Sequence, residues 1–317
     1  MNGLILSVLL QRLGIALISL FIVSLAVFAA TEMLPGDVAE ILLGQAATPD
    51  AVAGLREAMG LNEPAIYRYF RWLGGLLTGD MGTSYVNDTS VASMIGDRLS
   101  NTLKLAGVAA LLSVPLAMFL GVTSAMFRLS PYDRIISFLT IAVISVPEFM
   151  LATGGVLIFA VYLQWVPALS LASEVSSFGE LLRTFALPVG ILTVTVSVQM
   201  SRMTRAALID ILSSPYVEMA TLKGASMPRV VLKHALPNAI GPIANAVALS
   251  LSYLVGGVII IETVFNYPGV AKLMVDAVAT RDLPLIQSCA MIFCFSYLFL
   301  ITLADIAGIL ANPRLRT

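Results

Sequence analysis

Long apolar runs separated by shorter polar segments dominate the pattern along this chain. A run of about 20 apolar residues is long enough to cross the hydrocarbon core of a bilayer as a helix. The pattern predicts six spans, over residues 10–30, 102–127, 135–163, 187–203, 239–261 and 285–310. Because the number of spans is even, both ends of the chain are expected on the same side of the membrane.

The composition excludes an ordinary soluble globular protein. Hydrophobic residues make up 58% of the 317 residues and charged residues only 12%, with a mean hydropathy of +0.94. Soluble domains carry about 25% charged residues. The net charge of −1 gives no basic excess that would point to nucleic acid. We therefore expect an all-α, multi-pass membrane protein that contacts lipid and has no nucleic-acid partner.

The distribution of basic residues predicts the orientation. Loop 31–99 has four basic and nine acidic residues, whereas residues 201–236 include five basic and two acidic residues. Lys and Arg collect on the cytoplasmic side of membrane proteins. The bias predicts a cytoplasmic loop at 201–236, cytoplasmic termini at 1–9 and 312–317, and an extracytoplasmic loop at 31–99.

The long outer loop contains two helical patterns. Thr48 or Asp50 can cap a helix that starts near Pro49. Apolar residues at helical spacing predict a second helix over residues 64–77. We expect these helices to form a cap on the outer rim of the membrane-spanning bundle.

Residues 213–237 predict a short cytoplasmic helix, a reversal and a second helix. Ser213 and Ser214 precede Pro215, which is a helix-start signal. Gly224 permits the backbone to reverse after two helical turns. The second helix is amphipathic, and such a helix outside the bilayer is suited to docking in a groove on a partner.

Three prolines and one acidic residue interrupt the apolar runs. Pro115, Pro147 and Pro188 lie inside the second, third and fourth spans, where proline removes a backbone hydrogen bond and favours a kink. Glu148 lies inside the third run, where a carboxylate costs several kcal/mol unless it faces water or a partner. We therefore expect Glu148 to face the pore.

Glu148 is the centre of a candidate translocation path. We hypothesise that it contacts a cationic or amine group of the substrate, or a basic residue of a partner permease; a gating or packing role is the alternative. Polar residues of this kind also hold membrane helices together without lining a path. The candidate path residues are Ser145, Pro147, Glu148, Gln199 and Asn238.

The sequence contains no phosphate-binding loop of the form Gly-x4-Gly-Lys-Ser/Thr, so we do not expect the chain to hydrolyse ATP by that route. Energy for transport must then come from partners or from an ion gradient. Cys289 and Cys294 lie five positions apart in one apolar run, too far apart along a helix for a disulfide. We expect packing roles for both cysteines, and neither a metal site nor a catalytic site.

The cytoplasmic loop is similar to a family signature. The E-A-A-x3-G-x9-I-x-L-P pattern is that of the integral-membrane subunits of ATP-binding cassette (ABC) importers, and Met219 and His234 depart from it. Tyr216, Lys223 and His234 look like the variant found in the dipeptide, oligopeptide and nickel branch. The positions that match are Glu218, Ala220, Gly224, Leu236 and Pro237.

Other segments resemble the same branch and extend the similarity to nearly the whole chain. Tyr69 with Trp72 is one example in the outer loop. The others are residues 35–37, 60–64, 79–84, 98–103, 262–265, 268–269, 281–282, 284–285 and 313–314.

The resemblance implies the type I permease fold of ABC importers, with six transmembrane helices, an outer-loop helical cap and a cytoplasmic coupling helix. In that family the coupling loop is seated on an ATPase subunit. The implied ATPase-coupling residues are Tyr216, Glu218, Ala220, Lys223, Gly224, His234, Leu236 and Pro237.

The resemblance also implies partners and a location. The chain would form half of an alternating-access pathway in a bacterial or archaeal cytoplasmic membrane. Its partners would be a second homologous permease, two ATP-binding subunits and an extracytoplasmic solute-binding protein. ATP and Mg would bind to the ATPase subunits, and this chain would hold no cofactor and would not be an enzyme. The solute stays open among dipeptides, oligopeptides, nickel and related small solutes.

Two other classes of function remain open from the residues alone. An ion-coupled secondary transporter needs discontinuous helices with carboxylates or carbonyls placed for ions, and Glu148 by itself gives little support for one. A membrane scaffold without transport is the third possibility. Binding of an ATPase partner through residues 213–237 would distinguish an importer from both.

Overall fold

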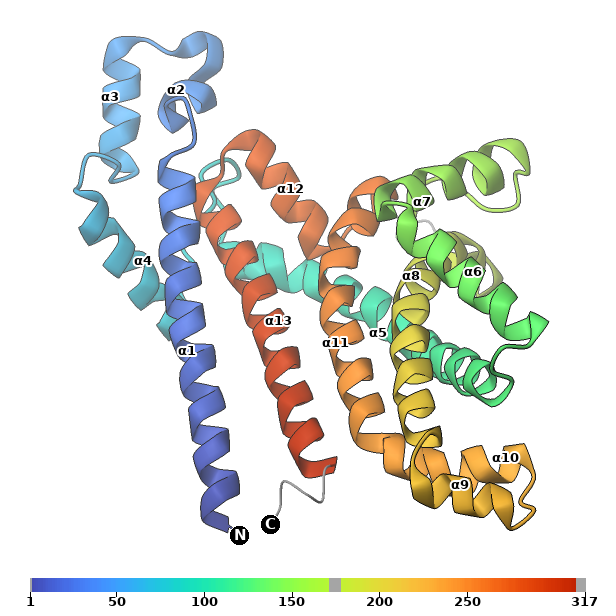
Figure 1. The fold of residues 1–317 in the computed structure, drawn as a ribbon. Coiled ribbons are helices and arrows are strands. Elements are labelled where there is room, and N and C mark those ends of the chain that lie inside the picture. The colour runs from blue at the N-terminus through green and yellow to red at the C-terminus, as the bar shows by residue number, and fades with distance from the viewer. Residues whose placement is uncertain (1, 171–177, 312–317) are drawn as a thin grey trace. The chain divides into compact units, whose positions relative to one another are not determined.

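Helices form almost every regular element in the computed structural model, which describes residues 2–170 and 178–311 (Figure 1). Residue 1 and the predicted C-terminal segment at 312–317 lie outside the described residues. The elements are α1 (Asn2–Glu32), α2 (Val38–Leu43), η1 (Gly44–Ala46), α3 (Pro49–Ala58), α4 (Ala65–Thr78), α5 (Val91–Met126), α6 (Pro131–Ser145), α7 (Glu148–Gly155), η2 (Val156–Tyr162), α8 (Phe178–Leu212), α9 (Pro215–Leu222), α10 (Met227–Arg229), η4 (Val230–Ala235), α11 (Leu236–Val264), α12 (Val270–Thr280) and α13 (Leu283–Ala311).

Five helices in the described chain are long and apolar enough to cross a membrane, and the total is six if the bent pair α6 and α7 counts as one span. The all-helical membrane fold predicted from the apolar pattern is therefore confirmed. One boundary differs clearly, because α5 begins at Val91 and includes residues assigned above to the outer loop. Val91 and Ile95 are buried in an apolar cluster, which accounts for the earlier start.

The predicted third span is not one continuous helix. α6 ends at Ser145 and α7 begins at Glu148, with a bend of 99° between them. Val146 (φ −97°, ψ 126°) and Pro147 (φ −55°, ψ 140°) interrupt the helical backbone. Proline disfavours the helical conformation in the residue before it and has no N–H of its own, so the break follows from the Val146–Pro147 pair.

Pro115 and Pro188 behave differently from Pro147. They lie inside the continuous helices α5 and α8, which have 36 and 35 residues. Neither proline breaks its helix, in contrast to Pro147. A proline removes only one hydrogen bond from such a long helix, and neighbouring helices compensate for the loss.

The chain folds as two compact units. The first contains Met1–Leu13, Lys104–Asn266 and Tyr297–Thr317, and the second contains Gly14–Leu103 and Tyr267–Ser296. The helices α1, α5 and α13 contribute residues to both units.

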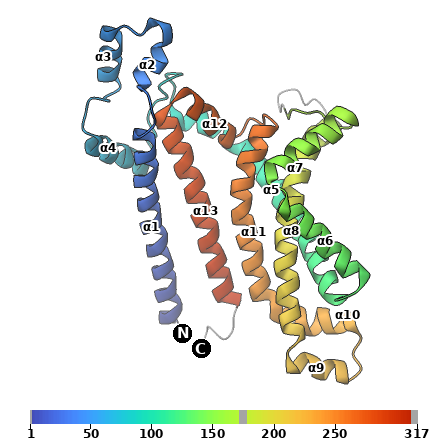
Figure 2. The same ribbon diagram turned by 45° about the horizontal axis from the view of Figure 1, so that its top comes forward.

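Close packing of α5, α8 and α11 builds the first unit. Helices α8 and α11 lie side by side in both views (Figures 1 and 2). α5 approaches α8 at Gly121, where an added Cβ would lie 2.8 Å from the carbonyl oxygen of Ser201. Only glycine permits this approach of the two backbones. The Ser197 hydroxyl also donates to the carbonyl of Ser113 at 3.2 Å, which adds a polar bond between α8 and α5.

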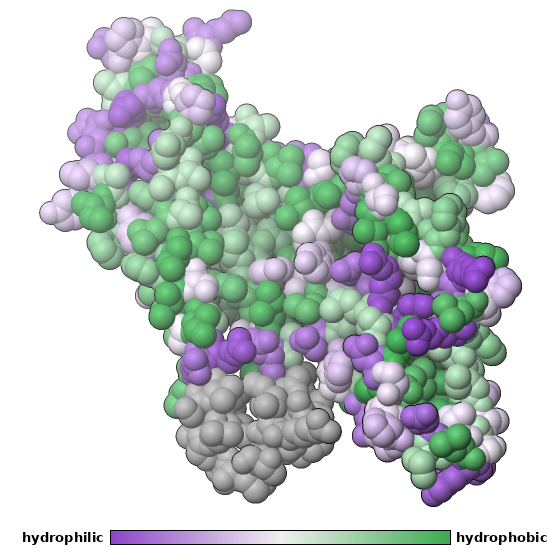
Figure 3. Space-filling model, in the orientation of Figure 1, coloured by the Kyte–Doolittle hydropathy of each residue, from purple (hydrophilic) through white to green (hydrophobic). Residues whose placement is uncertain are grey.

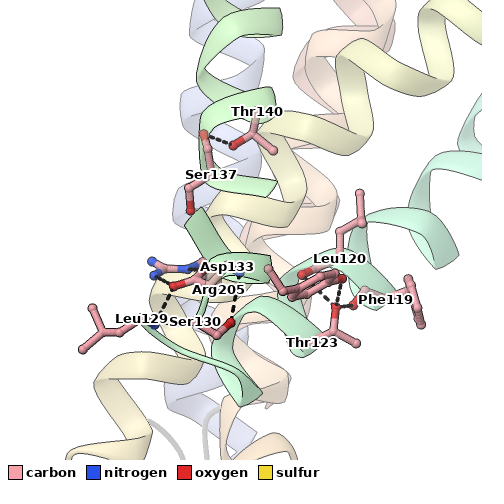
Figure 4. A network of polar contacts seen from close by, with 10 residues as sticks. Phe119, Leu120, Thr123, Leu129, Ser130, Asp133, Ser137, Thr140 and Arg205 are labelled. Atoms are coloured by element: carbon pink, nitrogen blue, oxygen red, sulfur yellow. Dashed lines mark hydrogen bonds and ion pairs between the residues drawn. The ribbon is translucent and has the colours of Figure 1, made fainter. Parts of the chain in front are cut away.

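An ion pair joins α6 to α8 (Figure 4). Arg205 donates from Nε to one carboxylate oxygen of Asp133 at 2.7 Å and from Nη2 to the other at 2.8 Å. The same carboxylate accepts the N–H of Leu129 at 3.0 Å. The Asp133 side chain is 4% exposed and that of Arg205 is 30% exposed. This bidentate geometry holds the N-terminal end of α6 against α8.

The second unit contains α2, α3 and α4, and hydrophilic residues gather over α2 and α3 (Figure 3). As predicted, Thr48 caps α3, because its hydroxyl accepts the N–H of Ala51 at 3.3 Å. The carboxylate of Asp282 accepts bonds from the Ser84 hydroxyl and from the Tyr85 N–H. These bonds fasten the end of the loop to the residue that precedes α13.

Removal of the Asp133 carboxylate should destabilise the protein. In Asp133→Ala, Arg205 keeps its charge at the helix interface without a partner, and we expect a loss of about 2 kcal/mol. The measurement is the melting temperature of the purified protein in detergent. Asp210→Ala is the matched control, because Asp210 lies exposed on the same helix α8 as Arg205. Equal melting temperatures for the two variants would show that the pair adds no stability.

Candidate functional site

A cavity of about 440 Å³ lies in the first unit beside the break between α6 and α7. Residues from α6, α7, α8 and α11 line it, together with the two residues of the break. The break brings Glu148 to the wall of this cavity because it starts a new helix at that residue. An acidic side chain from an apolar run thus borders open space between membrane-spanning helices.

The Glu148 carboxylate has weak partners in its surroundings. The hydroxyl of Thr195 lies 3.4 Å from Oε1 of Glu148, but it also lies 3.1 Å from the carbonyl oxygens of Ile191 and Leu192. A hydroxyl has one proton, so these three acceptors share it. Across residues 2–170 and 178–311, Glu148 takes part in none of the ion pairs found. The carboxylate is therefore available to a cationic group that enters the cavity.

Gly257 of α11 makes room for this carboxylate. A Cβ added at Gly257 would lie 2.6 Å from Oε1 and 3.2 Å from Oε2 of Glu148. Carbon and oxygen atoms that are not bonded do not approach so closely, and any larger residue would displace the carboxylate. The position of Glu148 thus depends on a glycine from a helix more than 100 residues later in the chain.

Three of the five residues predicted for the translocation path line the cavity: Pro147, Glu148 and Gln199. The other two do not line it. The hydroxyl of Ser145 donates to the carbonyl of Ile141 at 2.8 Å, and the Asn238 amide donates to the carbonyl of His234 at 2.8 Å. Both side chains satisfy the backbone of their own helix.

The sequence analysis selected Asn238 from α11 but missed the three residues of this helix that line the cavity. The three are Ser250, Tyr253 and Gly257. They are spaced by three and four residues, so they share one face of the helix. The sequence did contain a signal for these residues, because Ser250 and Tyr253 are polar and share a helix face with a glycine inside an apolar run.

The loop at residues 213–237 has the predicted helix, glycine turn and returning helix. α9 covers Pro215–Leu222, and Gly224 has φ +82°, a conformation that favours glycine. From Met227 the chain continues through α10, η4 and α11 as one helix that ends at Val264, 38 residues in all. The loop therefore connects directly to a helix that lines the cavity.

The predicted helix start is confirmed, since α9 begins at Pro215. Ser214 holds the cap position, but its hydroxyl donates to the carbonyl of Ile211 at 2.5 Å. The hydroxyl of Ser213 donates to the carbonyl of Asp210 at 2.7 Å. α8 ends just before these serines and leaves carbonyl groups without helical partners, which are the nearer acceptors.

The loop buries three valines and exposes a mixed surface of apolar and charged residues. Val217, Val230 and Val231 are buried between α9 and the returning helix. Glu218 and Met219 are exposed on the outside of α9. Packing of α9 on the returning helix therefore leaves an accessible outer face.

A hollow of about 390 Å³ opens on this loop, and Arg229 and Lys233, which the sequence analysis did not select, give it basic character. Four of the predicted coupling residues line it: Tyr216, Ala220, Lys223 and His234. The other four lie elsewhere on the loop: Glu218, Gly224, Leu236 and Pro237.

Two family models match the chain. The model described as "Binding-protein-dependent transport system inner membrane component" matches residues 113–317, and the one for the N-terminal part of such membrane components matches residues 5–106. The chain belongs to this family. It is a multi-pass inner-membrane permease subunit of an ABC importer, with the type I permease fold.

Three relatives resemble the permease along almost its full length. It is 32% identical to a protein of Brucella abortus (strain 2308) named for a peptide transport system, with 98% of this chain and 99% of the relative covered. A protein of Sinorhizobium fredii named for a peptide ABC transporter is 32% identical, with 97% and 98% covered. The glutathione transport system permease protein GsiC of Escherichia coli O6:H1 is 34% identical, with 94% and 95% covered. These comparisons give no support to the ion-coupled alternative.

A substitution at Gly257 should change transport by displacing Glu148. We expect Gly257→Ala to lower uptake by the assembled transporter several-fold while the amount of permease in the membrane stays normal, because the flexible carboxylate moves rather than the helix. Gly256→Ala is the matched control, since a Cβ at Gly256 meets nothing within 4 Å. Equal uptake rates for both variants, measured in proteoliposomes, would contradict this account of the cavity.

Proposed function

We propose that the permease forms one half of the translocation pathway of an importer for peptides or related small solutes. Its partners in this proposal are a second homologous permease, two ATP-binding subunits and an extracytoplasmic solute-binding protein. The names of the relatives support the choice of cargo, since they refer to peptide and glutathione transport. The family description supports the dependence on a binding protein.

The observation that carries this proposal is the position of the cytoplasmic loop between two helices of the cavity. α8 contributes Thr195 and Gln199 to the cavity and leads directly into α9. After Gly224 the returning helix leads to Tyr253 and Gly257, which also line the cavity. A force applied to the loop therefore acts on both of these helices.

The proposed mechanism is alternating access driven by the partner ATPases. ATP binding closes the ATPase pair, and the loop moves with the subunit on which it is seated. The loop transmits that movement to α8 and α11 as a rigid body. The bidentate bond between Arg205 and Asp133 extends the movement to α6, on the other side of the cavity.

ATP and Mg belong to the partner subunits in this proposal, because the chain has no phosphate-binding loop sequence. The exposed face of α9, with Tyr216, Glu218 and Met219, is the proposed contact to the ATPase. The basic hollow beside it suits acidic groups on the same partner.

We also propose that both termini lie in the cytoplasm. The excess of Lys and Arg in residues 201–236 supports this orientation. Arg12 of α1 and Asp305 of α13 form an ion pair at 2.9 Å. The pair brings the N-terminal part of the first span next to the C-terminal part of the last, as expected for ends on the same side.

The contact with the ATPase can be tested on the exposed residues of α9. Glu218→Ala and Tyr216→Ala, in permease reconstituted in nanodiscs, should each weaken binding of purified ATPase subunits about tenfold, or about 1.4 kcal/mol. Glu57→Ala removes an exposed charge from α3 in the outer loop and serves as the control. Unchanged affinity in both α9 variants would remove α9 from the interface.

The role of Glu148 is tested by Glu148→Gln, which keeps the size of the side chain and removes its charge. We propose that this carboxylate contacts a cationic or amine group of the passing solute, so uptake of a peptide with a free amino group should fall several-fold. The assay is ATP-driven uptake into proteoliposomes with saturating binding protein. Unchanged uptake at a normal amount of permease would contradict the proposed contact between Glu148 and the solute.

A further inference from the structure

The helix α4 in the outer loop has three distinct faces. One revolution takes 3.6 residues, so each residue turns the helix by about 100°. Tyr69 and Trp72 lie on one face, and Tyr69 is 3% exposed. Arg68, Arg71 and Gly75 lie on an adjacent face, which includes both arginines of the helix. The third face carries Ile66, Phe70 and Leu77, which are 58%, 58% and 80% exposed.

The buried face fixes α4 against the last turns of α1. The hydroxyls of Tyr69 and Ser24 lie 2.8 Å apart, and Ser24 is fully enclosed. The ring of Phe28 packs edge-on against Tyr69 with centroids 5.4 Å apart and lies 6.0 Å from Trp72. Arg68 pairs with Glu32, the last residue of α1, at 2.5 Å. Helix α4 therefore lies alongside residues 24–32 of α1.

This position sets the depth of α4. The apolar span of α1 covers Leu10–Glu32. Ser24 lies eight residues before its end, which at 1.5 Å per residue is about 12 Å inside the span. A hydrocarbon core is about 30 Å thick, so the contact between Ser24 and Tyr69 lies below the membrane surface. A helix held there meets lipid on any face that protein does not cover.

The helix α1, against which α4 packs, also exposes apolar side chains. Leu17, Ile18 and Leu25 of α1 are 59%, 62% and 42% exposed in the same unit. The face of α4 with the two arginines instead borders a cavity of about 650 Å³, to which Arg68 and Arg71 contribute with Glu32 and Asp80. Apolar residues on one side and a charged cavity on the other are the pattern of a helix at a membrane interface.

We propose that α4 is an interfacial helix embedded in the leaflet that surrounds the C-terminal end of α1, with Ile66, Phe70 and Leu77 among lipid acyl chains. In the proposed orientation this is the outer leaflet. Lipid, rather than protein, is the occupant because the face lies at the depth of the span, on a helix packed against α1, whose own apolar residues are exposed. The helix would hold the charged outer cavity at the membrane surface. This inference does not depend on the cargo or on the coupling loop.

Accessibility of spin labels tests the proposal in the assembled transporter in nanodiscs. Nitroxides are placed singly at residues 70 and 71, after Cys289→Ala and Cys294→Ala. The quantity measured is the ratio of a label's accessibility to oxygen, which partitions into lipid, to its accessibility to a water-soluble nickel complex. This ratio should be several-fold higher for the label at 70 than for the label at 71. The oxygen-to-nickel ratio of the label at 70 should approach that of a label at position 25 of α1. Arg71 is the matched control, since it is the next residue on the same helix.

Two outcomes overturn the proposal. A label at 70 that is as accessible to nickel as the label at 71 places the face in water. A label shielded from both oxygen and nickel places it under another protein subunit. If the cysteine replacements prevent folding, a photoreactive benzophenone side chain at position 70 in the native background replaces the nitroxide. Crosslinks to phospholipid, detected by mass spectrometry, support the proposal, and crosslinks only to protein or to neither contradict it.

Discussion

The bilayer offers no water to a peptide group, and this constraint governs the whole structure. Each apolar run must satisfy its N–H and C=O groups within a helix. The break at Val146–Pro147 meets the constraint by local bonds, since Val146 donates to Val143 at 3.2 Å and Pro147 accepts from Met150 at 2.9 Å. The chain can therefore turn through 99° inside an apolar run and present Glu148 to a cavity.

Close helix packing converts this local break into a site. Gly257 lets the carboxylate approach the backbone of α11, and Gly121 lets α5 approach α8. Small residues at contacts between membrane helices allow such approaches, because dispersion and hydrogen bonding rather than a hydrophobic driving force hold these helices together. The site and the loop at residues 213–237 are connected by the same two helices, α8 and α11, so the packing that forms the cavity also links it to the loop.

The predictable part of this protein is the part with strong local signals. The apolar runs predicted the membrane helices, Thr48 predicted the cap of α3, and Gly224 predicted the reversal after α9. Each signal depends on a few neighbouring residues or on composition over a single span. The family resemblance through Glu218 and Gly224 added the transport class, which no local signal specifies.

The remaining features depend on residues that are distant in the chain. Periodicity could not tell that Pro147 would break its span whereas Pro115 and Pro188 would not, because neighbouring helices decide whether a lost hydrogen bond is tolerated. The cavity needed Glu148, Thr195 and Gly257 to come together from α7, α8 and α11.

The sequence by itself determined which segments enter the membrane and which loop reverses, since hydropathy and backbone preference act within one segment. Only the tertiary structure decided which polar side chains share the cavity and which, like Ser145 and Asn238, bond to their own helix. The face that a side chain presents depends on helix rotation and packing, and packing is set by contacts between residues far apart along the chain.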